Sequence, residues 1–309
     1  MKKAVIAGAG VMGASLAQVY ARAGYQVLLW GRRESSLEKG RALIALNQST
    51  LVKESILSQA ESDLLISRIH YTCDKRCFAE EGVDIILENI VEKLDAKQAF
   101  WEEVSSMAPK TALLATNTSG LHISDIAQRM EGRDRFIGQR WLNPPHLLPL
   151  CELVVGKDTS EETVERMREL VIGLNKKPVV VKDINGFLIN RIQFAILREA
   201  LYIVETGAAT VEDIDNVMKY GLGLRYAALG PFLTADLGGL DTFDHIASYL
   251  FADLCDQKEK SAMLHGLVQA GKLGVKSGEG FYDYSDGKDE EAIRRRDELF
   301  IKLAKCLYQ

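Results

Sequence analysis

The 309-residue sequence lacks an excess of positive charge and a long hydrophobic run. Its net charge of -5 gives no basic field that would hold a phosphate polymer, so nucleic acid is not an expected partner. Apolar runs such as Ala112 to Ala115 are far shorter than the roughly 18 residues that cross a bilayer, and we expect no membrane span. Lys2 and Lys3 resemble the start of a signal peptide, but the apolar stretch behind them stops at Gly8 and predicts a strand instead.

Cysteines are also few. The five cysteines, at positions 73, 77, 151, 255 and 306, form an odd set without regular spacing. This pattern suits a reducing, cytoplasmic location better than a disulfide framework. Cys73 and Cys77 have no second pair of cysteines to complete four zinc ligands, so no metal site is expected.

The length and the 47% hydrophobic content predict two domains. Residues 1–182 alternate short aliphatic runs with amphipathic stretches, the pattern of a parallel sheet covered by helices in an α/β, Rossmann-like dinucleotide-binding domain. Residues 34–69 form a helical insertion of two expected helices. The expected strands cover residues 4–7, 26–30, 84–88, 112–116, 136–141, 150–155 and 178–182.

Residues 183–309 are expected to form an all-α domain for substrate binding and dimerisation. The run from Phe187 to Glu205 is apolar almost all round, as in a helix buried between neighbours or subunits. A monomer would leave much of this helix in water, so we expect a homodimer. Thr210 and Asp213 have the spacing of a capping box for a helix that continues to about Tyr220. Further helices are expected over 241–254, 260–270 and from 286 to the end.

A glycine-rich motif over residues 8–13 follows the first expected strand and opens a helix. In such motifs the first glycine permits a tight turn, the second lets the backbone approach a pyrophosphate, and the third lets helix and strand pack closely. The helix start then offers free N–H groups and a partial positive charge to the phosphates of a dinucleotide. The predicted cofactor-binding residues in this motif are Gly8, Gly10, Val11, Met12 and Gly13.

The second expected strand ends at Trp30 and is followed by Gly31, Arg32 and Arg33. An acidic residue at this place would normally bind the adenine ribose of NAD. With no carboxylate there, and two guanidiniums able to grip a 2'-phosphate, the residues favour NADP. The alternative is that Arg32 and Arg33 are solvated and that NAD binds.

Seven stretches, in order along nearly the whole chain, resemble the 3-hydroxyacyl-CoA dehydrogenase family. They are Gly8–Gly13, Leu87–Glu92, Thr116–Ser119, Asn143–Pro145, Gly186–Arg191, Gly230–Phe232 and Gly271–Tyr282. The resemblance implies a Rossmann-like domain, a helical domain that dimerises, and a substrate cleft between them. It also implies an oxidoreductase of fatty acid metabolism that interconverts a 3-hydroxyacyl-CoA and its 3-oxo form by hydride transfer to or from a nicotinamide. The family branch with Gly-Arg after the second strand is NADP-linked.

The resemblance also implies roles for individual residues. Ser119 and Asn190 would lie near the reacting oxygen. Lys53, in the insertion, would lie near the phosphates of coenzyme A, although a single exposed lysine is more often a solvated charge. The implied cofactor-binding residues beyond the glycine motif and the two arginines are Glu92, Lys97, Asn117, Asn143 and Lys276.

The chain departs from the family at the catalytic base. The family's histidine, oriented by a glutamate, stands two residues after a glycine and three before Asn-Pro. In this chain that position holds Arg140, and the glutamate is present as Glu152. A guanidinium stays protonated near neutral pH and cannot act as a general base, so ordinary hydroxyacyl oxidation is in doubt.

Three interpretations of Arg140 stay open. Paired with Glu152, it could donate hydrogen bonds to a carbonyl that becomes an alkoxide, which favours reduction. It could hold a substrate carboxylate, which moves the substrate toward a free hydroxy acid. It could disable catalysis and leave a cofactor-binding homologue with impaired activity.

Three further side chains are weaker candidates for the substrate site. His146 is the nearest replacement base, although a structural role is the simpler interpretation, and the same holds more strongly for His122. Arg225 lies in a stretch that looks like the carnitine and L-gulonate dehydrogenase branch. It would meet a substrate carboxylate or merely cap a helix end.

Overall fold

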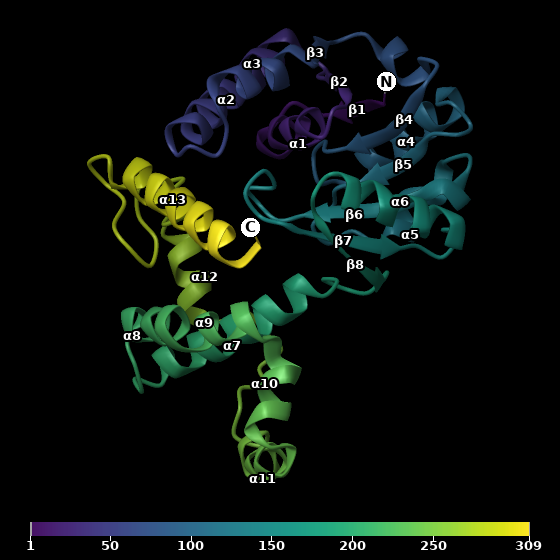
Figure 1. Ribbon diagram of the computed structural model, residues 1–309. Helices are drawn as coiled ribbons and strands as arrows, with labels where there is room; N and C mark the ends of the chain where they lie inside the picture. Colours follow the sequence, from purple (N-terminus) through teal and green to yellow (C-terminus); the bar gives the residue numbers. More distant parts are fainter. Residues whose placement is uncertain (1, 309) are drawn as a thin grey trace. The chain divides into compact units, whose positions relative to one another are not determined.

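A computed structural model describes residues 2–308 (Figure 1). The chain divides into two compact units, the first ending at Leu188 and the second beginning at Ile189. The sequence alone places this boundary after residue 182. In the structure the N-terminal unit also includes the linker 183–188, which leads to the first helix of the C-terminal unit.

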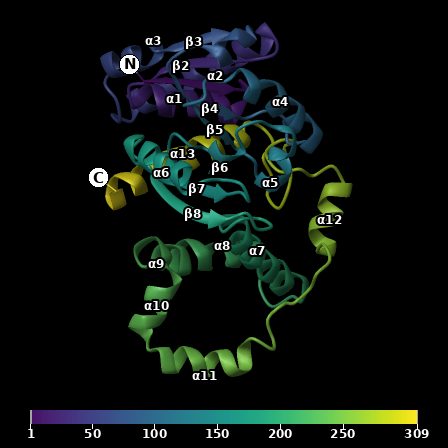
Figure 2. The same ribbon diagram turned by 90° about the vertical axis from the view of Figure 1, so that its right-hand side faces the viewer.

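The N-terminal unit is built on one eight-stranded sheet with the order β3-β2-β1-β4-β5-β6-β7-β8, which runs from top to bottom in Figure 2. Strands β1 to β6 pair in parallel, β7 is antiparallel to β6, and β8 is parallel to β7. This mostly parallel sheet confirms the predicted Rossmann-like class. The strands are β1 (Lys3–Ala7), β2 (Gln26–Trp30), β3 (Ile69–Thr72), β4 (Val83–Glu88), β5 (Leu113–Thr116), β6 (Phe136–Trp141), β7 (Leu150–Val155) and β8 (Lys177–Lys182).

Helices pack against the sheet, and nearly all residues of the central strands β1, β4, β5 and β6 are buried. Helix α1 packs against β1, β2 and β3 and carries α2 and α3 on its outer side, whereas α6 packs against β6, β7 and β8. The helices are α1 (Val11–Arg22), α2 (Glu34–Lys53), α3 (Gln59–Ser67), α4 (Leu94–Met107), α5 (Ile123–Ile126) and α6 (Glu161–Gly173). Short 3-10 turns cover Lys75–Ala79, Ala127–Arg129 and Arg133–Arg135.

Successive side chains of a strand point to opposite faces, and the hydrophobic core shows this alternation. Val5 of β1, Ile86 of β4 and Leu114 of β5 share one cluster with Trp101 of α4 and Phe136 of β6. These side chains are almost completely buried. The carboxyl ends of β1, β4, β5 and β6 therefore emerge side by side from a rigid base.

Strand β3 and the reversal at β7 are not foreseen in the sequence. In β3 only Ile69 is buried, so its four residues give no run or alternation of apolar side chains. The helical insertion is accordingly predicted to continue to residue 69. The loop between β6 and β7 is too short to contain a crossover helix. A loop without a crossover joins neighbouring strands only in antiparallel orientation, so β7 runs opposite to β6.

The C-terminal unit is helical, as predicted. The capping box is confirmed: Thr210 Oγ1 accepts the Asp213 N–H at 3.1 Å, and the Asp213 carboxylate accepts the Thr210 N–H at 3.2 Å. The helices are α7 (Ile189–Glu205), α8 (Val211–Val217), α9 (Gly223–Ala228), α10 (Gly230–Gly238), α11 (Leu240–Leu250), α12 (Ala262–Gln269) and α13 (Lys288–Tyr308), with a π-helical turn over Met218–Leu222.

Many apolar side chains of this unit are exposed. The apolar composition of α7 predicts a buried helix. In the structure only Leu201 of this helix is buried, so the described part of the chain does not enclose it. Helices α10 and α11 extend away from α7, α8 and α9 (Figures 1 and 2), and Phe232 in α10 is 86% exposed. Apolar surface on this scale is typical of a surface that another protein chain covers.

The glycine turn between β1 and α1 gives a test of the fold. A Cβ on Gly13 would lie 1.7 Å from the Gly8 carbonyl oxygen, whereas a Cβ on Gly10 meets nothing within 4 Å. We expect Gly13→Ala to lower the free energy of unfolding by at least about 2 kcal/mol and Gly10→Ala to change it by less than about 0.5 kcal/mol. Urea unfolding of both variants measures this, and equal stability of the two would contradict the close helix–strand contact.

Candidate functional site

The glycine motif forms a tight turn from β1 into α1. Gly8 has a φ of +104°, and a Cβ there would lie 2.5 Å from the carbonyl oxygen of Asn89 after β4. Gly10 caps α1 without a side-chain acceptor, so the first amides of the helix are left to a ligand or to water. Val11 and Met12 form the first turn of α1. The motif thus supplies the backbone geometry that a diphosphate requires.

A cavity of about 440 Å³ opens beside this turn. Arg32 and Arg33 follow β2, and Lys39 comes from α2, so three cationic side chains border it. The lining residues are Gly8, Ala9, Gly10, Trp30, Gly31, Arg32, Arg33, Ser35, Ser36, Lys39, Asn89, Ile90 and Val91. None of them is a carboxylate. The open space at Gly10 and the cationic border fit a dinucleotide that carries phosphates.

A buried ion pair holds the carboxyl end of β4. Glu88 is completely buried and accepts hydrogen bonds from Lys97 Nζ at 2.6 Å, Thr116 Oγ1 at 2.6 Å and the Ile90 N–H at 2.7 Å. Lys97, also completely buried, lies in α4 and reaches Glu92 at 3.3 Å as well. Lys97 therefore contacts two carboxylates within the N-terminal unit. Its contact with the site is indirect and runs through Glu92.

Glu92 in turn holds the loop after β5. Its Oε1 accepts the Thr118 hydroxyl at 2.5 Å and the Ser119 N–H at 2.7 Å. Asn117 joins three strands, because its side-chain amide donates to Asn89 at 2.8 Å and accepts the Trp141 N–H at 3.0 Å. The structure thus brings Glu92, Asn117 and Ser119 together at the carboxyl edge of β4, β5 and β6.

Arg140 and Glu152 are direct cross-strand partners in β6 and β7. Arg140 Nη1 donates to Glu152 Oε2 at 3.0 Å, and both side chains are buried. The other carboxylate oxygen, Oε1, accepts the Leu188 N–H at 2.9 Å. These contacts hold the orientation of Glu152 and, through it, of the guanidinium.

The loop between β6 and β7 contains two further sequence candidates, the exposed Asn143 and the half-buried His146. Lys176, which follows α6, donates from its Nζ to the carbonyl oxygens of Pro145 at 2.7 Å and Leu148 at 2.8 Å. Burial lowers the pKa of Lys176 to about 8. This lysine anchors the loop that follows Arg140.

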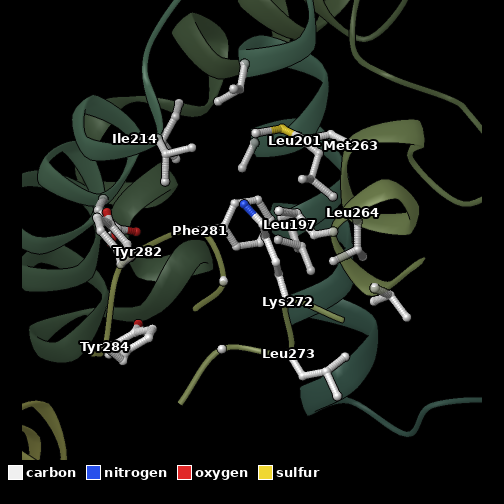
Figure 3. A pocket seen from close by; sticks show the side chains of 18 of the residues that line it. Leu197, Leu201, Ile214, Met263, Leu264, Lys272, Leu273, Phe281, Tyr282 and Tyr284 are labelled. Atoms are coloured by element: carbon white, nitrogen blue, oxygen red, sulfur yellow. Dashed lines mark hydrogen bonds between the residues drawn. The ribbon is translucent and has the colours of Figure 1, made fainter. Parts of the chain in front are cut away.

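The remaining candidates lie elsewhere. Lys53 is exposed at the end of α2 in the N-terminal unit. In the C-terminal unit, Asn190 lies in the first turn of α7 and Arg225 is exposed in α9. Lys276 lines a separate, mostly apolar cavity of about 580 Å³ within that unit, to which Lys272, Phe281 and Tyr282 also contribute (Figure 3).

Several residues at the carboxyl edge of the sheet are not among the site residues predicted from the sequence. Glu88 and Asn89 lie within a stretch that the family resemblance covers, yet their roles appear only when their partners on other elements are known. Lys39 and Ser36 follow the arginine pair by one to two helical turns, a spacing that could have indicated them. No group of three potential metal ligands and no helix able to span a membrane is found between residues 2 and 308.

Comparison with known proteins identifies the family. Residues 3–184 match the model for the 3-hydroxyacyl-CoA dehydrogenase NAD-binding domain, and residues 186–284 match the model for the C-terminal domain. The chain is 32% identical to the 5-formyl-3-hydroxy-2-methylpyridine 4-carboxylate 5-dehydrogenase of Mesorhizobium japonicum over 308 residues, 99% of this chain and 98% of that protein. It is 34% identical to the 3-hydroxybutyryl-CoA dehydrogenase of Clostridioides difficile over 286 residues, 92% of this chain and all of that protein.

Solved structures agree. The crystal structure of a 5-formyl-3-hydroxy-2-methylpyridine 4-carboxylic acid 5-dehydrogenase, described as an NAD+ dependent dismutase, superposes with a TM-score of 0.91 at 29% identity, covering 99% of this chain and 98% of the other. The fold, the glycine turn and both family models point the same way. The chain belongs to the 3-hydroxyacyl-CoA dehydrogenase family and is an oxidoreductase with that family's NAD-binding domain.

Proposed function

We propose that the protein is an NADP-linked reductase of a 3-oxo compound, in which Arg140 replaces the family's catalytic histidine. The observation that carries the proposal is the buried pair of Arg140 and Glu152, whose carboxylate is held a second time by the Leu188 N–H. A permanently protonated guanidinium donates hydrogen bonds and accepts no proton. It therefore stabilises the negative charge that a carbonyl oxygen gains when the 3-oxo compound is reduced.

A reduced nicotinamide nucleotide held by the glycine turn would supply the hydride for the carbonyl carbon, and water would supply the proton that completes the alcohol. Arg140 stabilises the oxygen as its negative charge develops, because a fixed cationic donor in a buried position is most effective there. Glu152 neutralises and orients the guanidinium. Glu92 holds the Ser119 backbone, and we assign Ser119 to the surroundings of the same oxygen.

For the nucleotide, we propose that Arg32, Arg33 and Lys39 bind the 2'-phosphate of NADP. The support is the cavity beside the glycine turn, whose border carries these three cations and no carboxylate. Ser35 and Ser36 add hydroxyl groups to the same border. NAD is the alternative, since a relative with nearly the same chain length is described as NAD+ dependent.

A second candidate concerns the substrate. The relative that covers 99% of this chain is named for a pyridine carboxylate rather than a thioester. Arg140 would then bind a substrate carboxylate with its guanidinium. Reduction of acetoacetyl-CoA would favour the thioester, and turnover of acetoacetate or of an aromatic formyl carboxylate alone would favour the free acid.

The nucleotide assignment is tested by binding. We expect NADPH to quench the intrinsic tryptophan fluorescence with a Kd at least about tenfold lower than that of NADH, because each charge-assisted phosphate contact contributes roughly 1.5–3 kcal/mol. Arg32→Gln and Lys39→Gln should weaken NADPH and leave NADH unchanged. Arg129→Gln, an exposed arginine outside the cavity lining, is the control. Equal or tighter binding of NADH to the wild type would refute the NADP assignment.

The role of Arg140 is tested by restoring a base. Arg140→His should raise the rate of 3-hydroxybutyryl-CoA oxidation by roughly 100-fold over the wild type, because general base catalysis is worth at least that factor. Arg140→Gln, which removes the cation and supplies no base, should slow both directions. Rates of acetoacetyl-CoA reduction and of the reverse oxidation measure this. A wild type that oxidises as fast as Arg140→His would contradict the proposal, and loss of oxidation in His146→Gln would point to His146 instead.

We also propose a homodimer formed through the C-terminal unit. Its support is the exposed apolar surface around α10 and α11: Phe232 and Leu237 in α10, and Phe251 directly after α11, are each at least 70% exposed. Light scattering at micromolar concentration should give about twice the chain mass of 34.3 kDa. Phe232→Glu combined with Leu237→Glu should shift the mass toward one chain, because charges in an apolar interface are costly. A wild type of single-chain mass would exclude the dimer.

A further inference from the structure

The linker 183–188 supplies a contact that helps to orient Glu152. The Leu188 N–H donates to Glu152 Oε1 at 2.9 Å. Just before it the backbone turns through two residues of positive φ, Gly186 at 74° and Phe187 at 52°. A non-glycine residue in this region costs about 1–2 kcal/mol. The Phe187 side chain is completely buried in the core of the sheet, which offsets that cost.

The other end of the linker is held by His122. The histidine lies in the loop between β5 and α5, and its Nδ1 is 3.1 Å from Asp183 Oδ1. Its Nε2 is 2.7 Å from the side-chain oxygen of Asn185. The second oxygen of Asp183 accepts the backbone N–H and the hydroxyl of Ser124, each at 2.9 Å. The linker is thus fixed at both ends of its turn.

Both ring nitrogens of His122 face oxygen atoms of the linker. A neutral imidazole carries one N–H and donates to only one acceptor, whereas the imidazolium donates to both. The charged groups that act on the ring are Asp183 from the linker and Asp125 from α5, and both are acidic. The hydrogen bond with Asp183, followed by that with Asn185, raises the pKa of His122 against the opposing effect of burial.

We propose that protonated His122 is a positioning residue: it clamps the start of the linker, so that the Leu188 N–H stays on Glu152 and the Arg140 guanidinium keeps its orientation. This inference rests on the proposed role of the Arg140–Glu152 pair. The same loop carries Ser119, which Glu92 holds from the other side. His122 therefore connects the loop beside the reacting oxygen with the linker behind the ion pair.

The direction of the pH effect follows from the raised pKa. The clamp is complete at low pH, where His122 is protonated, and one of its two hydrogen bonds is lost as the pH rises through the raised pKa of the histidine. Asp183 keeps its two bonds to Ser124 throughout. Deprotonation therefore loosens the linker without releasing it.

Amide hydrogen exchange at Leu188 tests the clamp without any substrate. In the full-length wild type, the protection of this amide should fall about tenfold between about pH 5.5 and about pH 8.5, after correction for the intrinsic rate. In His122→Gln, protection should already be low at the lower pH and should not change with pH. His70→Gln, an exposed histidine of β3, is the matched control and should behave as the wild type.

Two outcomes would overturn the proposal: unchanged Leu188 protection in His122→Gln, or the same loss in His70→Gln. If His122→Gln does not fold, Asp183→Asn, which weakens the same clamp from the linker side, is measured in its place with the same criteria. Turnover of acetoacetyl-CoA with NADPH is recorded for each variant. If the wild type shows no turnover, the proposed reaction is refuted, but the hydrogen-exchange result still tests the clamp. If an active wild type shows protection of Leu188 that does not change with pH, only the clamp is refuted.

Discussion

The site depends on one buried carboxylate, that of Glu88. Removing a carboxylate and an ammonium group from water costs several kcal/mol for each ion, and the pair is tolerable only if every remaining donor and acceptor finds a partner. Lys97, Thr116 and the Ile90 N–H meet that condition. The requirement locks α4 onto the ends of β4 and β5. Because Lys97 also contacts Glu92, the same ammonium group orients the loop that carries Ser119.

The pair of Arg140 and Glu152 obeys the same rule one strand further along the sheet. A lone buried guanidinium would be strongly destabilising, and Glu152 supplies both its counter-charge and a hydrogen bond. Glu152 is completed by a backbone N–H from the linker, as Glu88 is completed by that of Ile90. Two buried carboxylates, each held by a cation and an amide, therefore define the carboxyl edge where the reaction is proposed to occur.

Much of this architecture could be predicted from the sequence, because the strands that carry the site are short aliphatic runs with clear boundaries. The ends of β2, β6 and β7 are those expected. The family stretches contain Asn117, and the spacing from Gly138 and from Asn143 identifies the position of Arg140. Strand β3 could not be found, since one buried residue in four gives no periodic signal. The roles of Glu88 and His122 could not be predicted from the sequence either, because each depends on partners that lie on other elements and come close only in the folded sheet.

Replacing histidine by arginine at position 140 changes what the site can do more than how it is built. Either cation can pair with Glu152, so the strand pairing and the linker contact need not change. A histidine, however, can release its proton and serve the reaction in both directions, whereas an arginine remains a donor throughout. The stabilisation it gives a developing alkoxide lowers the barrier in either direction, but oxidation also needs a proton acceptor, which Arg140 does not provide. The proton for the alcohol must then come from water, so no side chain assigned here catalyses the proton transfer, and Arg140 acts on the charge of the oxygen alone.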